Sequence, residues 1–144
     1  MVRVERSAGA VVFRITADNQ AVFLLLQKPS GKWDFPKGNI EKGEPTLQTV
    51  GREIAEETGI VKIEILPDFK ETIKVFYRIE GEFVRKWIAF FLAKTSQKKI
   101  RISFEHQDFA WMPFEQAVKA VSYPQSRRIL RRVRSYLKLR GHAV

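Results

Sequence analysis

A loop followed by a helix with clear ends constrains the fold of this chain more than any other feature. Residues Lys28–Gly43 are rich in Gly, Pro and Lys, which predicts a functional loop. A helix is expected over Pro45–Thr58, because the missing N–H of Pro45 costs little near a helix start. Gly59 then follows the last turn, where a left-handed cap is common. The apolar stripe of this helix is predicted to comprise Leu47, Val50 and Ile54.

Apolar and β-branched segments around this helix predict a sheet. Strands are expected at Ala8–Arg14, Ala21–Gln27, Ile63–Leu66, Glu71–Ile79, Phe83–Lys94 and Phe109–Met112. Two further helices are expected near the end, at Phe114–Val121 and Gln125–Leu139. Helices placed between hairpin strands predict an α/β fold in which a mixed central sheet is sandwiched between helices. No repeat or linker interrupts this pattern, so residues 1–144 are expected to form a single domain.

The composition of the chain excludes several classes of protein and of site. The 144 residues are 44% hydrophobic, which is enough to bury a core and excludes a disordered chain. The absence of cysteine excludes disulfides, thiolate zinc sites and Cys nucleophiles. Charged residues near the N-terminus stand where a signal peptide needs an apolar core, and no apolar run approaches the ~20 residues of a membrane span. We therefore expect a soluble, cytoplasmic protein with no membrane association.

The charge of the chain points to anionic partners. The formal net charge is +10 and the pI is about 10.1, and a positive field of this kind attracts nucleotides, polyphosphates or nucleic acid. Much of the excess lies in the expected last helix, where Arg127, Arg131 and Arg134 share one face with Arg128 and Arg132 beside them. This helix could bind a longer polyphosphate, an inositol pyrophosphate or RNA, or could simply be a solvated basic face.

An acidic cluster on the first helix contrasts with the basic remainder. Glu53, Glu56 and Glu57 are spaced three and four residues apart, which places them on one face. Three such carboxylates repel one another unless a cation lies among them. Because the donors are oxygen atoms only, with no nearby His or Cys, Mg²⁺ or Mn²⁺ is favoured over Zn²⁺. Taken alone, the cluster fits a solvent-exposed acidic helix face better than a metal site, since acidic clusters on helices are common.

The neighbouring residues favour chemistry over a solvated face. Arg52 can hold one carboxylate through a bidentate contact, and Glu44 can support the loop. Gly38 lets backbone oxygen approach a metal ion, and Lys37 can meet a phosphate. A loop, an acidic helix and a cation at one place are what phosphoryl chemistry requires.

The spacing of these residues resembles that of a known family. Gly38, then Glu44 after five residues, then Arg52–Ile60 after seven more, match G-x5-E-x7-R-E-U-x-E-E-x-G-U, the Nudix box, at every fixed position. The resemblance implies an α/β/α sandwich that hydrolyses a nucleoside diphosphate linked to another moiety. It also implies that a divalent metal binds Glu53, Glu56, Glu57 and the Gly38 carbonyl, while Arg52 orients a carboxylate. The metal would activate a water molecule, and the base that takes its proton would be Glu53, Glu57 or Glu105.

Two further segments resemble a subgroup of that family, the asymmetrical diadenosine tetraphosphate (Ap4A) hydrolases. They are Trp33–Glu44, which resembles W-x-F/P-P-K-G-x-x-E-x-G-E, and Phe104–Trp111, which resembles E-H-Q-x-Y/F-x-W. This implies cleavage of Ap4A to ATP and AMP, with Glu105 as a distal carboxylate that assists metal or water. The residues then expected to bind substrate are Lys28, Lys37, Lys86 and His106 at phosphates, and Tyr77 and Tyr123 around an adenine ring.

Other readings of these residues stay open. His106 could be a structural hydrogen-bonded histidine, Lys28 a solvated lysine, Tyr77 a strand-packing residue and Tyr123 a helix-junction contact, while Phe76 would replace Tyr77 if the strand register shifts by one. Another Nudix substrate is the main alternative: a diphosphoinositol polyphosphate, a damaged nucleoside triphosphate or an RNA 5′ end. The sequence Pro36–Asn39 differs from the P-Q-G-G of RNA pyrophosphohydrolases, which weighs against the last. A non-catalytic nucleotide-binding domain is disfavoured because every box carboxylate is present.

Overall fold

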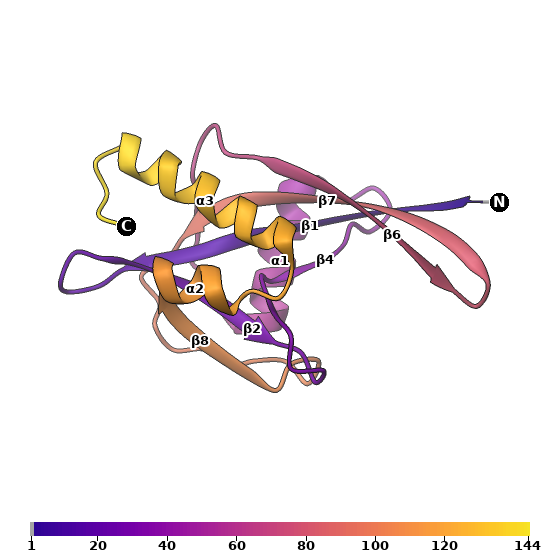
Figure 1. The fold of residues 1–144 in the computed structure, drawn as a ribbon, viewed down its shortest axis with the longest axis horizontal. Coiled ribbons are helices and arrows are strands. Elements are labelled where there is room, and N and C mark those ends of the chain that lie inside the picture. The colour runs from indigo at the N-terminus through magenta and orange to yellow at the C-terminus, as the bar shows by residue number, and fades with distance from the viewer. Residues whose placement is uncertain (1) are drawn as a thin grey trace.

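Eight strands form one mixed sheet across residues 2–144, the residues that the computed structural model describes. Its main path is β3-β2-β1-β7-β5, with β4 paired to β1, β6 to β7 and β8 to β2. The strands are β1 (Val2–Ile15), β2 (Ala21–Gln27), β3 (Trp33–Asp34), β4 (Lys37–Asn39), β5 (Glu64–Ile65), β6 (Glu71–Ile79), β7 (Glu82–Lys94) and β8 (Asp108–Pro113). The helices are α1 (Thr46–Thr58), α2 (Phe114–Ala120) and α3 (Pro124–Leu139) (Figure 1).

Two apolar cores lie on opposite faces of this sheet. On one face, Val50 and Ile54 of α1 pack with residues such as Leu24 of β2. On the other face, Ile129 and its neighbours in α2 and α3 pack with residues such as Phe23. Strand residues alternate between the two cores because successive side chains of a strand point to opposite faces. The predicted α/β/α sandwich with a mixed sheet is therefore confirmed.

The parallel pair of β1 and β7 forms the centre of the sheet. Its register runs from Val2 opposite Phe83 to Phe13 opposite Lys94. Residues 8–13 of β1 are buried, which is why that stretch is continuously apolar in sequence. The predicted strand Ala8–Arg14 is too short, because β1 already begins at Val2. The charged residues at the start of the chain did not predict a strand, but they lie on an exposed extension of β1.

The catalytic-motif helix has nearly the expected ends. α1 begins at Thr46, with Pro45 as the preceding cap residue, and ends at Thr58. The cap residue Gly59 follows with a φ of 75° and donates its N–H to the Ala55 carbonyl. Val50 and Ile54 are fully buried, as predicted, but Leu47 is 51% exposed. Leu47 lies in the first turn, ahead of the part of the helix that packs on the sheet, so its assignment to the apolar stripe is wrong.

Smaller differences concern the remaining elements. β5 covers only Glu64–Ile65 of the expected Ile63–Leu66, and α3 starts one residue early at Pro124, whose fixed φ suits a first helical turn. Phe104 is 95% exposed because it lies in the loop before β8. None of the helices described in residues 2–144 has both the length and the apolar character needed to cross a membrane.

The β6–β7 hairpin and the start of β1 extend beyond the helices. Glu80 and Gly81 form the hairpin turn, with φ values of 51° and 76°, which is the left-handed backbone that a tight two-residue turn requires. Val2–Arg6 of β1 lies in parallel beside β7 along this hairpin. These three strand segments project from the body of the molecule (Figure 1), and we call them the arm: residues Val2–Arg6, Lys74–Ile79 and Glu82–Trp87.

Candidate active site

Gly38 and Glu53 bring the loop and the helix into close contact. β4 places Gly38 opposite Ala8 of β1, directly beside α1. A Cβ atom on Gly38 would lie 1.9 Å from Oε1 and 2.2 Å from Oε2 of Glu53. No side chain fits there, so glycine is required for a close approach and not for an unusual φ. The Glu53 carboxylate consequently lies against the backbone of β4.

Arg52 fixes the loop before α1 to the helix. Its Nε and Nη2 atoms donate to the two oxygens of Glu44 at 2.7 and 2.9 Å, which is a bidentate contact. Its Nη1 lies 3.3 Å from Oε1 of Glu53, and its Nη2 donates to the Asn39 carbonyl at 3.0 Å. Hydrogen bonds from Arg52, and then from Thr49, hold the pKa of Glu44 at about 2, so this carboxylate is ionised throughout the neutral range.

Glu57 is a buried carboxylate that lacks full charge compensation. Only 6% of the residue is exposed, and burial raises the pKa of Glu57 to about 8, with repulsion from Glu53 as the next cause. Burial also raises the pKa of Glu53. Two carboxylates that resist ionisation side by side are stabilised when a cation binds between them. Carboxylate and carbonyl oxygens are the donors that a hard divalent cation prefers, so the residues fit the metal that the motif implies.

The other two acidic residues of the predicted site are more exposed than Glu53 and Glu57. The Glu56 side chain is 58% exposed and pairs with Arg52 at 3.4 Å. Glu105 is also exposed and contributes to the wall of the cleft described below. Across the described residues, no three His, Cys, Asp or Glu side chains are gathered closely enough to hold a metal ion as they stand.

A cleft brings most of the predicted site residues together. It has a volume of about 510 Å³. The predicted site residues that line it are Lys28, Lys37, Gly38, Glu57, Lys86, Glu105 and His106. A second chamber of about 610 Å³ shares the three lysines and is lined by Tyr77, Tyr123 and Phe76 together with apolar residues of β6 and β7. The shared lysines make the two chambers neighbours. One end of the cleft is therefore charged and the other is aromatic.

The cationic groups of the charged chamber are partly desolvated. Burial, and then the nearby charge of Lys37, lowers the pKa of Lys86. Burial also lowers the pKa of His106, which favours its neutral form. The Nε2 atom of His106 lies 3.8 Å from Oε1 of Glu57, and its buried Nδ1 has no hydrogen-bond partner within residues 2–144. The fully hydrogen-bonded structural histidine, one of the two readings of this residue, is not what the structure contains.

The two tyrosines of the aromatic chamber are each held by a charged residue. The Tyr77 hydroxyl donates to Oε1 of Glu5 at 2.5 Å, and this bond raises the pKa of Tyr77. The Nζ of Lys28 donates to the Tyr123 hydroxyl at 3.3 Å and lies 5.2 Å from the ring centroid. Tyr77 comes from β6 and Tyr123 from the residue before α3, so the fold brings together two rings that lie far apart in sequence.

Two supporting residues were missed by the sequence reasoning. Asp34 is only 7% exposed and accepts hydrogen bonds from Nζ of Lys37 at 3.1 Å and from Oγ of Ser126 at 3.0 Å. It thereby connects Lys37, which is predicted to bind phosphate, to the start of α3. Glu5 orients Tyr77 from the start of β1. Asp34 was visible beside Trp33 in the loop motif, but its contact with Ser126 could not be inferred, because it depends on the tertiary fold.

The basic helix lies mostly outside this cleft. Arg127 donates to the Val121 carbonyl at 3.0 Å, and Arg134 lies 3.5 Å from Glu115 and over the Phe114 ring. Of the three arginines predicted to share one face, Arg127 and Arg134 therefore contact other residues of the protein, while Arg131 does not point to the same partners. A separate cavity of about 590 Å³ is lined instead by Arg128, Arg131 and Arg132 of α3 and by Asp68–Glu71.

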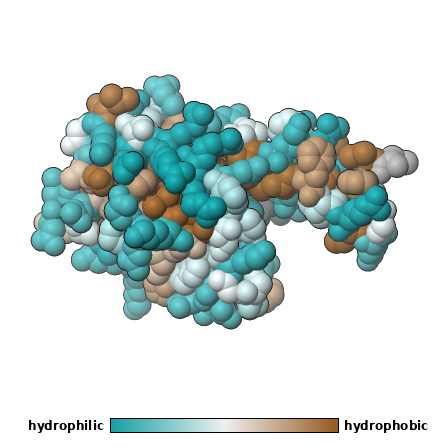
Figure 2. Space-filling view, viewed as in Figure 1, coloured by the Kyte–Doolittle hydropathy of each residue, from teal (hydrophilic) through white to brown (hydrophobic). Residues whose placement is uncertain are grey.

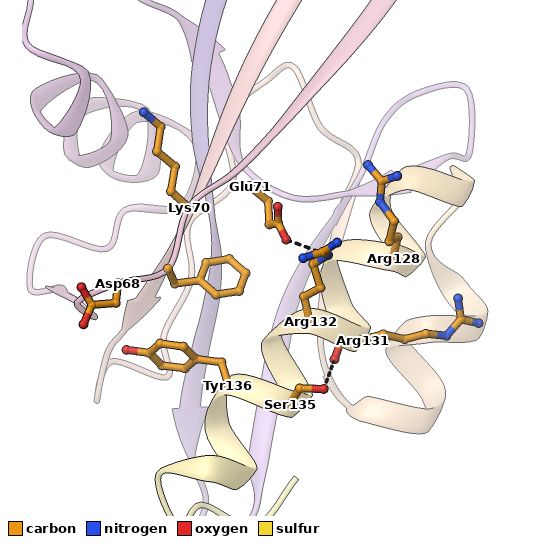
Figure 3. A pocket seen from close by; sticks show the side chains of 9 residues that line it. Asp68, Lys70, Glu71, Arg128, Arg131, Arg132, Ser135 and Tyr136 are labelled. Atoms are coloured by element: carbon orange, nitrogen blue, oxygen red, sulfur yellow. Dashed lines mark hydrogen bonds and ion pairs between the residues drawn. The ribbon is translucent and has the colours of Figure 1, made fainter.

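Figure 3 shows how the cavity beside α3 is arranged. Arg132 reaches across to Glu71, and their charged atoms lie 2.8 Å apart. Arg128 and Arg131 extend on the side away from Asp68, and within residues 2–144 neither of them has an ion-pair partner. This cavity shares no lining residue with the cleft, so the arginines are not part of the candidate catalytic machinery.

Comparisons with known proteins identify the family of this chain. A family model described as "NUDIX domain" matches residues 5–133. A Caenorhabditis elegans protein named bis(5′-nucleosyl)-tetraphosphatase (asymmetrical) is 34% identical over 139 residues, covering 93% of this chain and 97% of the relative. A Mus musculus protein of the same name is 32% identical, covering 92% of this chain and 95% of the relative. The crystal structure of a C. elegans Ap4A hydrolase binary complex matches with a TM-score of 0.81 at 34% identity, covering 93% of this chain and 98% of that one.

Proposed function

Because the chain belongs to the Nudix family of pyrophosphohydrolases, we propose that it cleaves diadenosine tetraphosphate asymmetrically, to ATP and AMP, with Mg²⁺ as the metal. The single observation that carries this proposal is the two-part cleft. Its charged chamber holds Glu57, Lys37 and Lys86, and its aromatic chamber holds Tyr77 and Tyr123. A dinucleoside polyphosphate has matching parts: a polyphosphate chain for the cations and an adenine ring for the tyrosines.

The reaction adds water across one phosphoanhydride bond. A water oxygen forms a new bond to phosphorus, the bridging P–O bond breaks, and the bridging oxygen leaves with the departing phosphate. A bound divalent cation would lower the pKa of that water and neutralise charge on the phosphate oxygens. One carboxylate must then take the proton of the water. The candidates are Glu57 and Glu105, which line the charged chamber, and Glu53, whose carboxylate lies beside Gly38.

The metal would be held by oxygen atoms of the loop and of α1. We assign the role of ligand to Glu53, Glu56, Glu57 and the Gly38 carbonyl, with Glu105 contributing from the far wall. Arg52 supports them by keeping Glu44 and Glu53 in place. Oxygen-only ligation favours Mg²⁺, with Mn²⁺ as a substitute.

The phosphates would meet the cations that line the charged chamber. Lys37 is positioned by Asp34, Lys86 projects from β7, and Lys28 lies between the chamber and Tyr123. His106 offers its unpartnered Nδ1 beside them. Desolvated cations attract phosphate more strongly than cations in water do, because the effective dielectric constant is lower there.

The setting of this activity is also part of the proposal. Residues 1–144 are proposed to work as one Nudix domain, which fits the extent of the family match. A cytoplasmic location fits a chain whose sequence contains no cysteine, since reducing compartments do not favour disulfides.

A substrate panel tests the proposal. The purified protein is incubated with Mg²⁺ and, separately, Ap4A, Ap5A, ADP-ribose, 8-oxo-dGTP and diphosphoinositol pentakisphosphate, and the products are separated by chromatography. Ap4A should have the highest kcat/KM, and Glu57→Gln should abolish turnover. Another substrate with a much higher kcat/KM would replace the assignment. Ap4A binding without turnover, unchanged in Glu57→Gln, would instead indicate a nucleotide-binding domain.

A further inference from the structure

One face of the arm carries only apolar and cationic side chains. The cross-strand register places one residue each from β1, β7 and β6 in three successive rows. Directly paired residues point to the same side of a sheet, and residues two apart along a strand share that side. The three rows are Val2–Phe83–Arg78, Val4–Arg85–Phe76 and Arg6–Trp87–Lys74. We call these nine residues the arm face; Tyr77 and Lys86 point to the opposite side of the sheet.

The arm face repeats a simple unit. Each row contains one aromatic ring and at least one cation, and none of the nine positions is acidic. The guanidinium carbon of Arg78 lies 4.3 Å from the ring centroid of Phe83. The Nζ of Lys74 lies 5.0 Å from the Trp87 ring and 5.6 Å from the Phe76 ring. Successive rows lie about 7 Å apart, because each is two strand residues from the next.

These rings and aliphatic groups are exposed to an unusual extent. Phe76 is 59% exposed, Phe83 44%, Val2 51% and Val4 47%. No helix covers the arm where it projects from the body (Figure 1), and Figure 2 shows hydrophobic residues interspersed with hydrophilic ones along it. Contiguous apolar groups on a protein surface indicate an interaction site.

The charges on the arm face select among partners. A second copy of the chain, docked face to face, would bring four cations against four cations with no carboxylate to offset them. An anionic lipid surface would match the charge but has no flat rings to match the aromatic repeat. A single-stranded nucleic acid supplies both parts, because its bases stack on aromatic rings while its phosphates meet the cations.

We propose that the arm face binds single-stranded nucleic acid, with bases stacked on Phe83, Phe76 and Trp87 and phosphates at the flanking cations. The contact differs from the hydrolysis of a nucleotide in the cleft, because Phe83 and Trp87 line neither chamber of the cleft; of the nine arm-face residues, only Phe76 also lines the aromatic chamber. It also differs from a contact through the basic helix α3. There, Arg127 and Arg134 are engaged internally, and Arg128 and Arg131 line a separate cavity.

Binding is measured by fluorescence anisotropy with an unstructured single-stranded oligonucleotide of about 16 nucleotides, a length that several stacked bases need. Its 5′ end carries the fluorophore in place of a phosphate, and the buffer lacks divalent metal, so hydrolysis does not interfere. Phe83→Ala should weaken binding about fivefold or more, since one base loses its stacking partner. Lys74→Ala combined with Arg78→Ala should reduce the slope of log affinity against log salt by about 1.4, since each lost phosphate contact removes about 0.7.

Two matched controls locate the surface. Ile79→Ala removes an apolar group that is 46% exposed on the opposite side of the arm. Arg128→Ala combined with Arg131→Ala removes the same charge from α3 as the arm variant removes from the arm. Both controls should change affinity less than about twofold, and every variant should keep the melting temperature and Mg²⁺-dependent turnover of the wild type.

Three outcomes would overturn the proposal. The first is no measurable binding of the oligonucleotide by the wild type. The second is an equal loss of affinity in the α3 variant or in Ile79→Ala. The third is normal oligonucleotide binding by Phe83→Ala together with loss of self-association, measured by sedimentation, or of binding to phosphatidylserine vesicles. That result would assign the arm face to a second copy or to a membrane instead.

Discussion

The Glu53 carboxylate occupies the space that a side chain at Gly38 would need, with a Cβ there only 1.9 Å from Oε1 of Glu53. The two residues belong to different elements, β4 and α1, and meet because β4 pairs with β1 under the helix. A close contact of this kind is sensitive to a single methyl group, because a close-packed interior has no room to absorb it. The contact therefore ties the loop proposed to bind substrate to the helix proposed to bind metal.

Gly38→Ala should lower kcat for the preferred substrate by at least about tenfold, because the added methyl group displaces Glu53 from the proposed metal site. Steady-state kinetics at saturating Mg²⁺ measures the effect. Gly51→Ala is the matched control within α1, since a Cβ at Gly51 has nothing within 4 Å. That control should leave kcat unchanged and stabilise the fold by about 0.5–1 kcal/mol. Equal kcat in the two variants would refute a role for the close contact.

Arg52→Lys should reduce kcat by about 10–100-fold, because a lysine keeps the charge but cannot form the bidentate contact to Glu44. Arg131→Lys on α3 is a control for the same change of residue type and should have wild-type kinetics. A wild-type kcat in Arg52→Lys would mean that charge alone, and not the planar geometry, supports the carboxylates.

Metal-free protein should lose stability as the pH rises from about 4.5 to about 8. The pKa of Glu57 is about 8 in the folded protein and near its ordinary value of 4.5 in the unfolded chain, so the folded state binds the extra proton in this window. Its stability relative to the unfolded chain then falls as that proton is lost. Thermal unfolding across this range measures the slope, and Glu57→Gln should flatten it.

The same buried carboxylate predicts a pH-dependent response to metal. A divalent cation binds the ionised form, so Mg²⁺ should raise the melting temperature more at pH 8 than at pH 5.5. Glu57→Gln should remove most of this difference. An equal Mg²⁺ effect at both pH values, retained in the variant, would contradict the placement of metal at Glu57.

Tyr77→Ala should raise KM for Ap4A about tenfold and leave kcat nearly unchanged, because stacking on the adenine is present in both ground and transition states. Tyr77→Phe keeps the ring and loses only the hydroxyl contact to Glu5, so its KM should rise much less. Steady-state kinetics of both variants provides the test. A fall in kcat alone would argue against a stacking role.

The parts of the site that could be predicted from sequence are those fixed by local spacing. Gly38, Glu44, Arg52 and Glu53 lie within one loop and one helix, so their residue types and their intervals already define the contacts that the structure contains. The ends of α1 were predictable for the same reason, since Pro45 and Gly59 act through the local backbone.

Contacts between distant segments were not predictable in this way. The hydrogen bond from Tyr77 to Glu5 spans 72 positions, and that from Ser126 to Asp34 spans 92. Both depend on strand register and on the docking of α3, which no single segment specifies. The start of β1 was missed because Val2–Arg6 is a short, charged and mostly exposed segment, and its extended conformation depends on pairing with β7.

Products of Ap4A hydrolysis in ¹⁸O-labelled water test the central claim most directly. The wild-type protein with Mg²⁺ is expected to give ATP and AMP in equal amounts, with one labelled oxygen incorporated per bond cleaved, and Glu57→Gln should give neither product. Two molecules of ADP, an absence of products, or turnover that persists in Glu57→Gln would contradict asymmetrical cleavage by water at this site.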